Sequence, residues 1–287
     1  MTAAIAAPTL DTRPLGPFGV EIRGVDLGGG IDDGLGDAIG RAFLDHQLLL
    51  FRDQALNPAA QVAFARRFGE VQVHVMNQYH DGGLPELYVL SNRGPDGRPN
   101  GRHPDKGTLY WHTDNSWSRV TGHATFLYVE AAPAEGGGTE WADMYAAYDR
   151  LDPAERDRLS GLRAVHNLDF SRTRRHGHDP MTDEQRRQKP PVDHPIVRTH
   201  PETGRKCLYL GDHAETIQGM DYAEGRALVQ AINDRIVTPD IVTGHRWRAG
   251  DFVVWDNRCL LHRAQPYDPA KDIRVIRRCT TLGEVPH

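Results

Sequence analysis

The stretch YWHTDNSW, residues 110–117, places His112 and Asp114 two positions apart between two tryptophans. An imidazole nitrogen and a carboxylate oxygen are both good ligands for a divalent metal ion. Residues i and i+2 of an extended segment point to the same side, so both side chains can reach one ion. The same pair also suits a hydrogen-bonded polar turn, and the spacing alone leaves both interpretations open.

A second histidine–aspartate pair with this spacing, His103 and Asp105, lies nine residues earlier. Its middle residue is Pro104, which cannot donate a hydrogen bond to a sheet, so we expect this pair in a loop. With 15 histidines in the chain, a chance pair is expected. We therefore favour His112 and Asp114 as the metal-binding pair.

His262 is the best candidate for a third ligand, because it follows the strand-like stretch FVVW at 252–255. Two imidazoles and one carboxylate on one face of an octahedron leave three positions open, which is the arrangement of non-haem Fe(II) oxygenases. His262 lies 150 residues after His112, but packed sheets can bring distant strands together. A lone histidine at this place can equally be a structural residue.

The elements that must position these residues mix strands and helices without a regular alternation. Apolar residues recur at helical spacing over 32–46, and a capping residue followed by proline predicts that helices begin at Asn57 and Asp152. Strand-like stretches lie at 48–53, 87–91, 252–255 and 273–282. We expect one α+β domain over residues 1–287, with antiparallel sheets and helices packed outside.

Two long polar stretches interrupt this pattern, and we interpret both as loop insertions. Residues 74–111 are rich in Gly, Pro, Asn and Asp, and residues 171–191 are rich in arginine with few apolar residues. Long irregular connections are usually either functional or disordered. The basic stretch therefore has two interpretations, a solvated mobile insertion or a lid over an anionic substrate.

The bulk composition argues against several classes of partner. The net charge is −5, so no global basic field predicts a nucleic-acid partner. No apolar run approaches the roughly 20 residues of a membrane helix, and the start of the chain lacks the basic residues of a secretory signal. Three widely spaced cysteines do not form a disulfide framework. We expect a cytoplasmic protein whose cysteines are buried or free thiols.

Four motifs carry a resemblance to a known family. They are YWHTDNSW, GGGTEWADMYAAYDRL (136–151), GDFVVWDNRCLLHRAQPYD (250–268) and RVIRRCTTLGE (274–284). In this order and spacing they resemble the taurine/2,4-dichlorophenoxyacetate dioxygenase family, from about Gly19 to Glu284. The stretch from 190 to 220 is more similar to the aryloxyalkanoate-cleaving branch than to the taurine branch.

The resemblance implies a double-stranded β-helix (jelly-roll) core flanked by helices, and a dioxygenase that uses Fe(II), 2-oxoglutarate and O2. It implies that His112, Asp114 and His262 form the catalytic iron site, and that Thr139 and Arg274 bind the far carboxylate of 2-oxoglutarate. The implied reaction hydroxylates a small anionic substrate next to a heteroatom and cleaves an aryloxyalkanoate ether. Members of the family often form homo-oligomers, and we expect one here.

The resemblance places three further residues near the substrate. Arg278 matches an arginine that meets the anionic end of the substrate or supports the cosubstrate. It lies four residues after Arg274, so both side chains point to the same side of a strand. His74 matches a histidine of the taurine branch, and His213 resembles a pocket position of the aryloxyacetate branch, with a structural histidine as the alternative. The stretch KGTLYW lacks an asparagine of the taurine branch, which disfavours taurine itself.

Other functions remain open. Within the family, the alternative substrates are a taurine-like sulfonate, an alkyl sulfate or a natural-product carboxylate. The same three ligands would also suit Zn²⁺ in a hydrolase or lyase of the same fold, but Thr139 and the two arginines would then have no clear role. A non-catalytic binding protein with an idle metal site is a further alternative.

Overall fold

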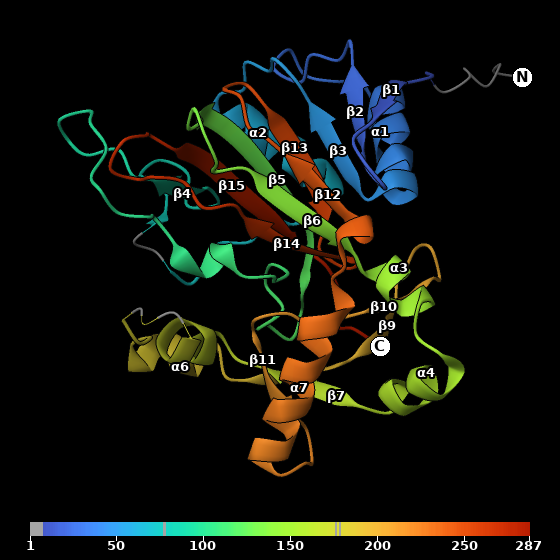
Figure 1. Cartoon of the computed structure of the whole chain (residues 1–287). Coiled ribbons are helices and arrows are strands. Elements are labelled where there is room, and N and C mark those ends of the chain that lie inside the picture. Colours follow the sequence, from blue (N-terminus) through green and yellow to red (C-terminus); the bar gives the residue numbers. More distant parts are fainter. Residues whose placement is uncertain (1–7, 77–78, 176, 178) are drawn as a thin grey trace, which may run out of the picture.

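Seven strands form the largest sheet in the computed structural model, which describes residues 8–76, 79–175, 177 and 179–287 (Figure 1). In spatial order they are β1 (Asp11–Pro14), β2 (Val20–Arg23), β3 (Leu48–Phe51), β13 (Phe252–Asp256), β5 (Gly122–Ala131), β15 (Val275–Leu282) and β4 (Tyr88–Ser91). Neighbouring strands are antiparallel except β2 and β3, which are parallel. Strands that are far apart in the sequence, such as β5 and β13, are therefore direct neighbours.

A three-stranded sheet packs against this main sheet. Its order is β12 (Val242–His245), β6 (Thr139–Asp143) and β14 (Leu260–Ala264). Trp141 of β6 and Trp255 of β13 are almost fully buried, and their ring centroids lie 5.8 Å apart. The hydrophobic core that joins the two sheets therefore borders the strand that carries His262.

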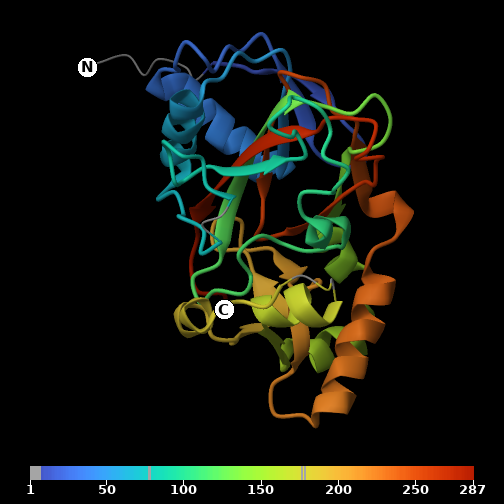
Figure 2. The same ribbon diagram turned by 90° about the vertical axis from the view of Figure 1, so that its left-hand side faces the viewer.

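Two smaller sheets lie in the lower part of Figure 1. They are β11 (Ala214–Ile217), β7 (Arg163–His166) and β8 (Val192–Pro195), and the pair β9 (Val197–Thr199) and β10 (Lys206–Leu208). Helix α7 (Tyr222–Ile236) runs along one side of this part (Figure 2). A Cβ at Gly225 would lie 2.4 Å from Thr216 Oγ1, so the missing side chain lets α7 approach β11 closely.

The helices begin where the capping residues predict. Asp32, Asn57 and Asp152 each accept a hydrogen bond of 2.8 Å from the backbone N–H three residues later. These residues cap α1 (Asp33–His46), α2 (Pro58–Ala65) and α4 (Pro153–Ser160). Two shorter helices are α3 (Met144–Asp149) and α5 (Leu168–Phe170), and the 3₁₀ turn η1 (Arg66–Phe68) follows α2. Mixed sheets covered by helices confirm the α+β class.

The structure differs from the loop expected at 171–191. This stretch contains a π-helical turn, η4 (Ser171–Arg175), and helix α6 (Asp183–Gln188). Thr182 accepts a hydrogen bond from the backbone of Gln185, whose side chain accepts one from the backbone of Thr182. This reciprocal cap, together with the ion pair between Arg187 and Glu184, stabilises a helix that needs no apolar face.

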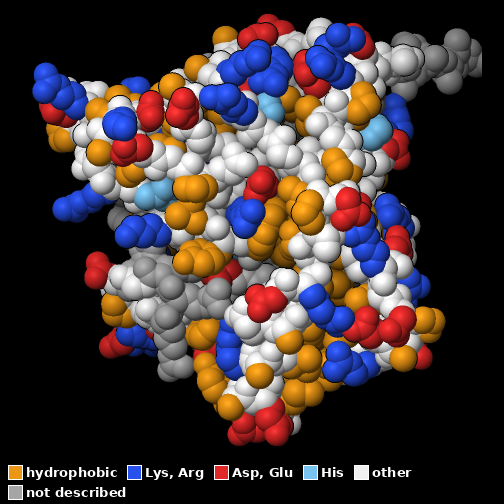
Figure 3. All heavy atoms as spheres, viewed as in Figure 1, with side chains coloured by type: hydrophobic (Ala, Val, Ile, Leu, Met, Phe, Trp, Pro, Cys, Tyr) orange, Lys and Arg blue, Asp and Glu red, His pale blue; other side chains and the backbone are white. Residues whose placement is uncertain are grey.

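Residues 74–111 are mostly irregular, apart from β4 and the 3₁₀ turn η3 (Lys106–Leu109). The three cysteines are buried free thiols, as predicted. None of the helices in the described parts of the chain combines the length and apolar character needed to span a bilayer. On the face shown in Figure 3, acidic and basic side chains are interspersed, so this face has no broad basic patch.

Candidate active site

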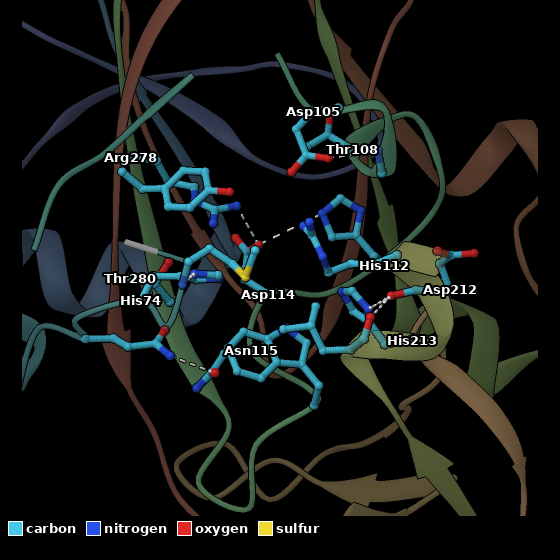
Figure 4. Close-up of a pocket in the computed structure, with 18 residues that line it drawn as sticks. His74, Asp105, Thr108, His112, Asp114, Asn115, Asp212, His213, Arg278 and Thr280 are labelled. Atoms are coloured by element: carbon cyan, nitrogen blue, oxygen red, sulfur yellow. Dashed lines mark hydrogen bonds and ion pairs between the residues drawn. The ribbon is translucent and has the colours of Figure 1, made fainter. Parts of the chain in front are cut away.

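The side chains of His112, Asp114 and His262 converge, and their ligand atoms all lie within 4.8 Å of one another. His112 Nε2 is 3.9 Å from Asp114 Oδ1, and His262 Nε2 is 3.7 Å from Asp114 Oδ2. These separations are too long for hydrogen bonds. They suit donors that surround one ion at bond lengths of about 2.1 Å. Figure 4 shows His112 and Asp114 directed toward this common space.

Backbone pairing holds the two distant histidines together. His262 is the central residue of β14, and His112 forms an isolated antiparallel bridge with it. The N–H of His112 donates to the carbonyl of His262 at 3.0 Å, and the N–H of His262 donates back at 2.8 Å. The chain then turns at Asp114, and Asn115 adopts a φ of 60°. The extended segment expected for both residues therefore ends before Asp114.

The protonation of the three side chains suits metal binding. His112 Nδ1 lies 2.7 Å from the carbonyl of Tyr110 and donates to it, which leaves the Nε2 lone pair for a metal. Burial, followed by the field of His112, holds the pKa of His262 well below its usual value. Burial alone would raise the pKa of Asp114, but Arg278 and the two histidines outweigh it and hold that pKa low. Two neutral imidazoles and a carboxylate are the forms that bind metal.

A small inner cavity lies beside His262. It is lined by Leu90, Thr108, Leu127, Thr139, Trp255, His262, Ala264, Arg274 and Arg278. Arg274 is 3% exposed, and no carboxylate among the described residues pairs with it. Burial lowers its pKa to about 10, so it stays charged at neutral pH. A buried cation of this kind calls for an anionic ligand.

An outer cavity lies on the other side, beside His112 and Asp114 (Figure 4). His74, Tyr88 and Trp117 form an aromatic corner in it, with the His74 ring centroid 4.9 Å from Tyr88 and 5.2 Å from Trp117. Thr108 and Arg278 line both cavities. Together the two cavities border all three candidate ligands, with His262 in the inner one and His112 and Asp114 in the outer one.

The predicted residues divide between these cavities. Thr139 and Arg274 line the inner cavity, and His74 and His213 line the outer one. Arg278 reaches both, donating from Nη1 to Asp114 Oδ1 at 2.9 Å. Arg274, directly before β15, and Arg278, within it, both line the inner cavity.

The polar groups of the outer cavity have defined hydrogen bonds. The backbone N–H of Met76 donates to His74 Nδ1 at 3.0 Å, so Nε2 carries the ring proton. Burial, followed by the field of Arg278, holds the pKa of His74 well below its usual value. His213 Nδ1 lies 2.9 Å from Ser171 Oγ, and its ring centroid is 5.9 Å from that of His112. His74 is thus a neutral donor at the cavity wall.

A family model described as "Taurine catabolism dioxygenase TauD, TfdA family" matches residues 11–280. The chain belongs to this family. An (S)-phenoxypropionate/alpha-ketoglutarate-dioxygenase of Sphingobium herbicidovorans is 37% identical over 276 residues, which cover 91% of each chain. An alpha-ketoglutarate-dependent 2,4-dichlorophenoxyacetate dioxygenase of Cupriavidus pinatubonensis is 36% identical over 281 residues, covering 95% of this chain and 97% of the relative.

A solved structure supports the same family assignment. The crystal structure of AAD-2 in complex with Mn(II) and N-oxalylglycine aligns with a TM-score of 0.82 and 32% identity, covering 97% of this chain and 99% of that one. The protein is therefore a 2-oxoglutarate-dependent dioxygenase of the TauD/TfdA family, with Fe(II) as its cofactor and 2-oxoglutarate and O2 as its cosubstrates.

Sequence reasoning missed several residues of the dioxygenase's outer cavity. Gln72, Tyr88, Asp105 and Trp117 line it, and Asp105 belongs to the pair that was expected in a loop and set aside as a metal-binding pair. Its partner His103 has a pKa lowered to about 4, first by burial and then by Arg274. The signal was the position of the 74–111 stretch, which leads directly into the motif at 110–117.

A second cluster in the dioxygenase, made of His200, Asp256 and Cys259, also brings three possible ligand atoms within 4.8 Å of one another. Its groups are already paired. Asp256 accepts from His200 Nε2 at 3.0 Å and from Arg258 at 2.7 and 2.8 Å. This cluster is a charge-balanced structural network and leaves no free ligand set.

Proposed function

We propose that this dioxygenase cleaves an aryloxyalkanoate by hydroxylating the carbon next to the ether oxygen. One oxygen atom of O2 enters the substrate, and the other enters succinate as 2-oxoglutarate loses CO2. The hydroxylated carbon then releases a phenol and leaves a glyoxylate-type product. The observation that carries this proposal is a buried ligand triad between a cationic inner cavity and an aromatic outer cavity.

In this proposal His112, Asp114 and His262 hold the iron. The residues fit Fe(II), because two imidazole donors and one carboxylate converge without hydrogen bonds among them. When bound, Fe(II) supplies the O2-dependent oxidation of 2-oxoglutarate and of one substrate C–H bond.

Thr139 and Arg274 hold the far carboxylate of 2-oxoglutarate in the inner cavity. The guanidinium of Arg274 has no carboxylate partner in the described chain and keeps donors free for an anion. Charge-assisted bonds of this kind contribute about 1.5–3 kcal/mol each. The inner cavity therefore selects a dicarboxylate over a shorter keto acid.

The outer cavity holds the substrate. The aromatic corner packs against the aryl ring, while His74 Nε2–H and Arg278 donate to the substrate carboxylate, and His213 borders the same space. Enclosure excludes water and directs one C–H bond at the metal. The names of two relatives that are 36–37% identical support an aryloxyalkanoate as the substrate.

We also propose that the two packed sheets are the halves of a double-stranded β-helix. Successive strands change sheets, because β13 lies in the main sheet, β14 in the three-stranded sheet and β15 in the main sheet again. β5 and β6 make the same change earlier in the chain. This alternation supports the jelly-roll core.

Anaerobic titration of the protein with Fe(II) and 2-oxoglutarate tests the proposal. A weak visible charge-transfer band is expected, and it should shift when phenoxyacetate is added. Aerobic turnover should then release phenol and succinate in equal amounts. A band that shifts only with a sulfonate or an alkyl sulfate would reject the aryloxyalkanoate. An alkyl sulfate belongs in the panel because a sulfate ester dioxygenase of Pseudomonas putida is 33% identical.

No band in protein that has bound iron would reject the roles of the inner cavity. Full activity with Zn²⁺ and without 2-oxoglutarate would favour a hydrolase or lyase. His46→Ala is a matched control for His112→Ala, because His46 lies at the end of α1 and lines neither cavity.

A further inference from the structure

We infer that Asn257 is a positioning residue that fixes the Asp114 carboxylate and the Trp255 indole from a single buried amide. This inference rests on the proposed metal site. Asn257 follows directly after β13 and is 0% exposed. It lines neither cavity, so it acts through the residues that it contacts.

The backbone of the metal-binding motif is fastened to Asn257. The hydroxyl of Thr113, the residue between the two ligands, donates to the carbonyl of Asn257 at 2.7 Å. The N–H of Asp114 donates to Asn257 Oδ1 at 3.2 Å. The turn that aims the Asp114 side chain therefore has two anchors on one residue.

A second path reaches the carboxylate itself. Asn257 Nδ2 donates to Thr125 Oγ1 at 2.8 Å, and Thr125 Oγ1 donates to Asp114 Oδ2 at 2.7 Å. An ionised carboxylate only accepts, so the single hydroxyl proton of Thr125 must point to Asp114. The hydroxyl then accepts from Asn257 Nδ2 and also from Thr280 Oγ1, which lies 3.0 Å away, so the relay from Asn257 to Asp114 has one direction.

The orientation of the amide is fixed by the same logic. Asn257 Oδ1 accepts from the N–H of Asp114 and from Trp255 Nε1, which lies 3.0 Å away. Both partners are donors only, so an amide turned by 180° would place donors against donors. Trp255 in turn lines the inner cavity, and its ring centroid lies 4.7 Å from that of His262.

The amide of Asn257 thus connects the Asp114 carboxylate with Trp255, whose ring lies beside that of His262. Hydrogen-bond partners of metal ligands commonly change metal affinity by about 10–100-fold when they are removed. Thr125→Val is the first test, because it keeps the shape of the side chain and removes only the hydroxyl. Asn257→Ala removes every hydrogen bond that the Asn257 side-chain amide makes to Asp114, Trp255 and Thr125.

Thr281→Val is the matched control. Thr281 is also fully buried, and its hydroxyl bonds only to the backbone of Ala124. Mn(II) affinity is measured by calorimetry without substrate, and urea unfolding is followed in EDTA. We expect Thr125→Val and Asn257→Ala each to weaken Mn(II) binding by about 10-fold or more. Thr281→Val should lower stability without changing Mn(II) affinity.

The double variant completes the test. If both residues act through one relay, Asn257→Ala with Thr125→Val should bind Mn(II) more tightly than the product of the two single losses predicts. Unchanged Mn(II) affinity in a folded Thr125→Val protein, or fully multiplicative losses, would overturn the inference and leave the proposed function intact. Failure of the unaltered protein to bind Mn(II) would overturn both.

Discussion

The inner and outer cavities lie on either side of the three candidate ligands, with His262 lining the inner one and His112 and Asp114 lining the outer one, but they are built differently. Strand residues make most of the inner cavity, with Leu127 from β5, Thr139 from β6 and Trp255 from β13. Connecting segments make most of the outer one, through residues around 72–76, 105–117, 168–172 and 212–213. In a strand, the sheet register fixes which side chains point inward, whereas loops tolerate amino-acid substitutions. The residues proposed to bind 2-oxoglutarate therefore lie in or beside strands, whereas most of the residues proposed to border the substrate lie on connecting segments.

The cavities also differ in charge. The inner one holds Arg274, a buried cation without a carboxylate partner in the described chain. The outer one mixes acids and bases, since Asp105, Asp212, Arg172 and His213 all line it. Charge alone can select an anion in the inner cavity, whereas the outer cavity depends on shape and on a few directed donors.

The largest expected effect comes from disrupting the candidate metal site that lies between the two cavities. His112→Ala deletes one of three candidate ligands, and we expect turnover to fall to the background rate together with Mn(II) binding. Succinate release and calorimetry check both. Retained activity would show that the triad is not the catalytic metal site.

A change confined to the inner cavity should affect only 2-oxoglutarate. Arg274→Met keeps the length of the side chain and removes the charge, so we expect the KM for 2-oxoglutarate to rise about 100-fold. The KM for an aryloxyalkanoate should stay within about twofold. Steady-state kinetics with each substrate varied in turn decides this, and equal changes in both constants would contradict a separate inner cavity.

A change in the outer cavity should affect the aryloxyalkanoate and leave 2-oxoglutarate binding unchanged. His74→Leu removes one donor to the substrate carboxylate, so kcat/KM for an aryloxyalkanoate should fall about tenfold. The charge-transfer band formed anaerobically with 2-oxoglutarate should be unchanged before substrate is added. A weaker band would mean that His74 supports the cosubstrate instead.

The smallest effect concerns stability at acidic pH near the inner cavity. Burial, followed by Arg274, lowers the pKa of His103 from 6.5 to about 4. Between about pH 4 and 6.5, His103 is therefore protonated in the unfolded chain but not in the folded one. The free energy of unfolding falls as the pH drops from about 6.5 to about 4. His103→Gln should make this fall slightly shallower in urea unfolding at several pH values. Curves that stay parallel to those of the unaltered protein would contradict the assignment.

The sequence predicted the elements whose signals are local. Asn57 and Asp152 cap helices as expected, and the apolar spacing of 32–46 matches α1. The triad was predicted from spacing and from the resemblance together, because the bridge between His112 and His262 has no local signal.

The outer cavity could not be predicted in the same way. Gln72 and Asp105 come from a stretch without periodicity, where tertiary contacts decide which side chains face inward. Helix α6 was predictable in principle, since Thr182 and Gln185 have the spacing of a capping box. Its lack of apolar residues concealed it.

The bridge between His112 and His262 has a consequence for how the protein acquires its metal. It closes a loop of 150 residues, and contacts of such long range form slowly because loop closure must precede any gain. A chain emerging from the ribosome lacks the third donor until β14 has been made. The complete set of three donors therefore comes together only after β14 has been made and has paired with the segment around His112.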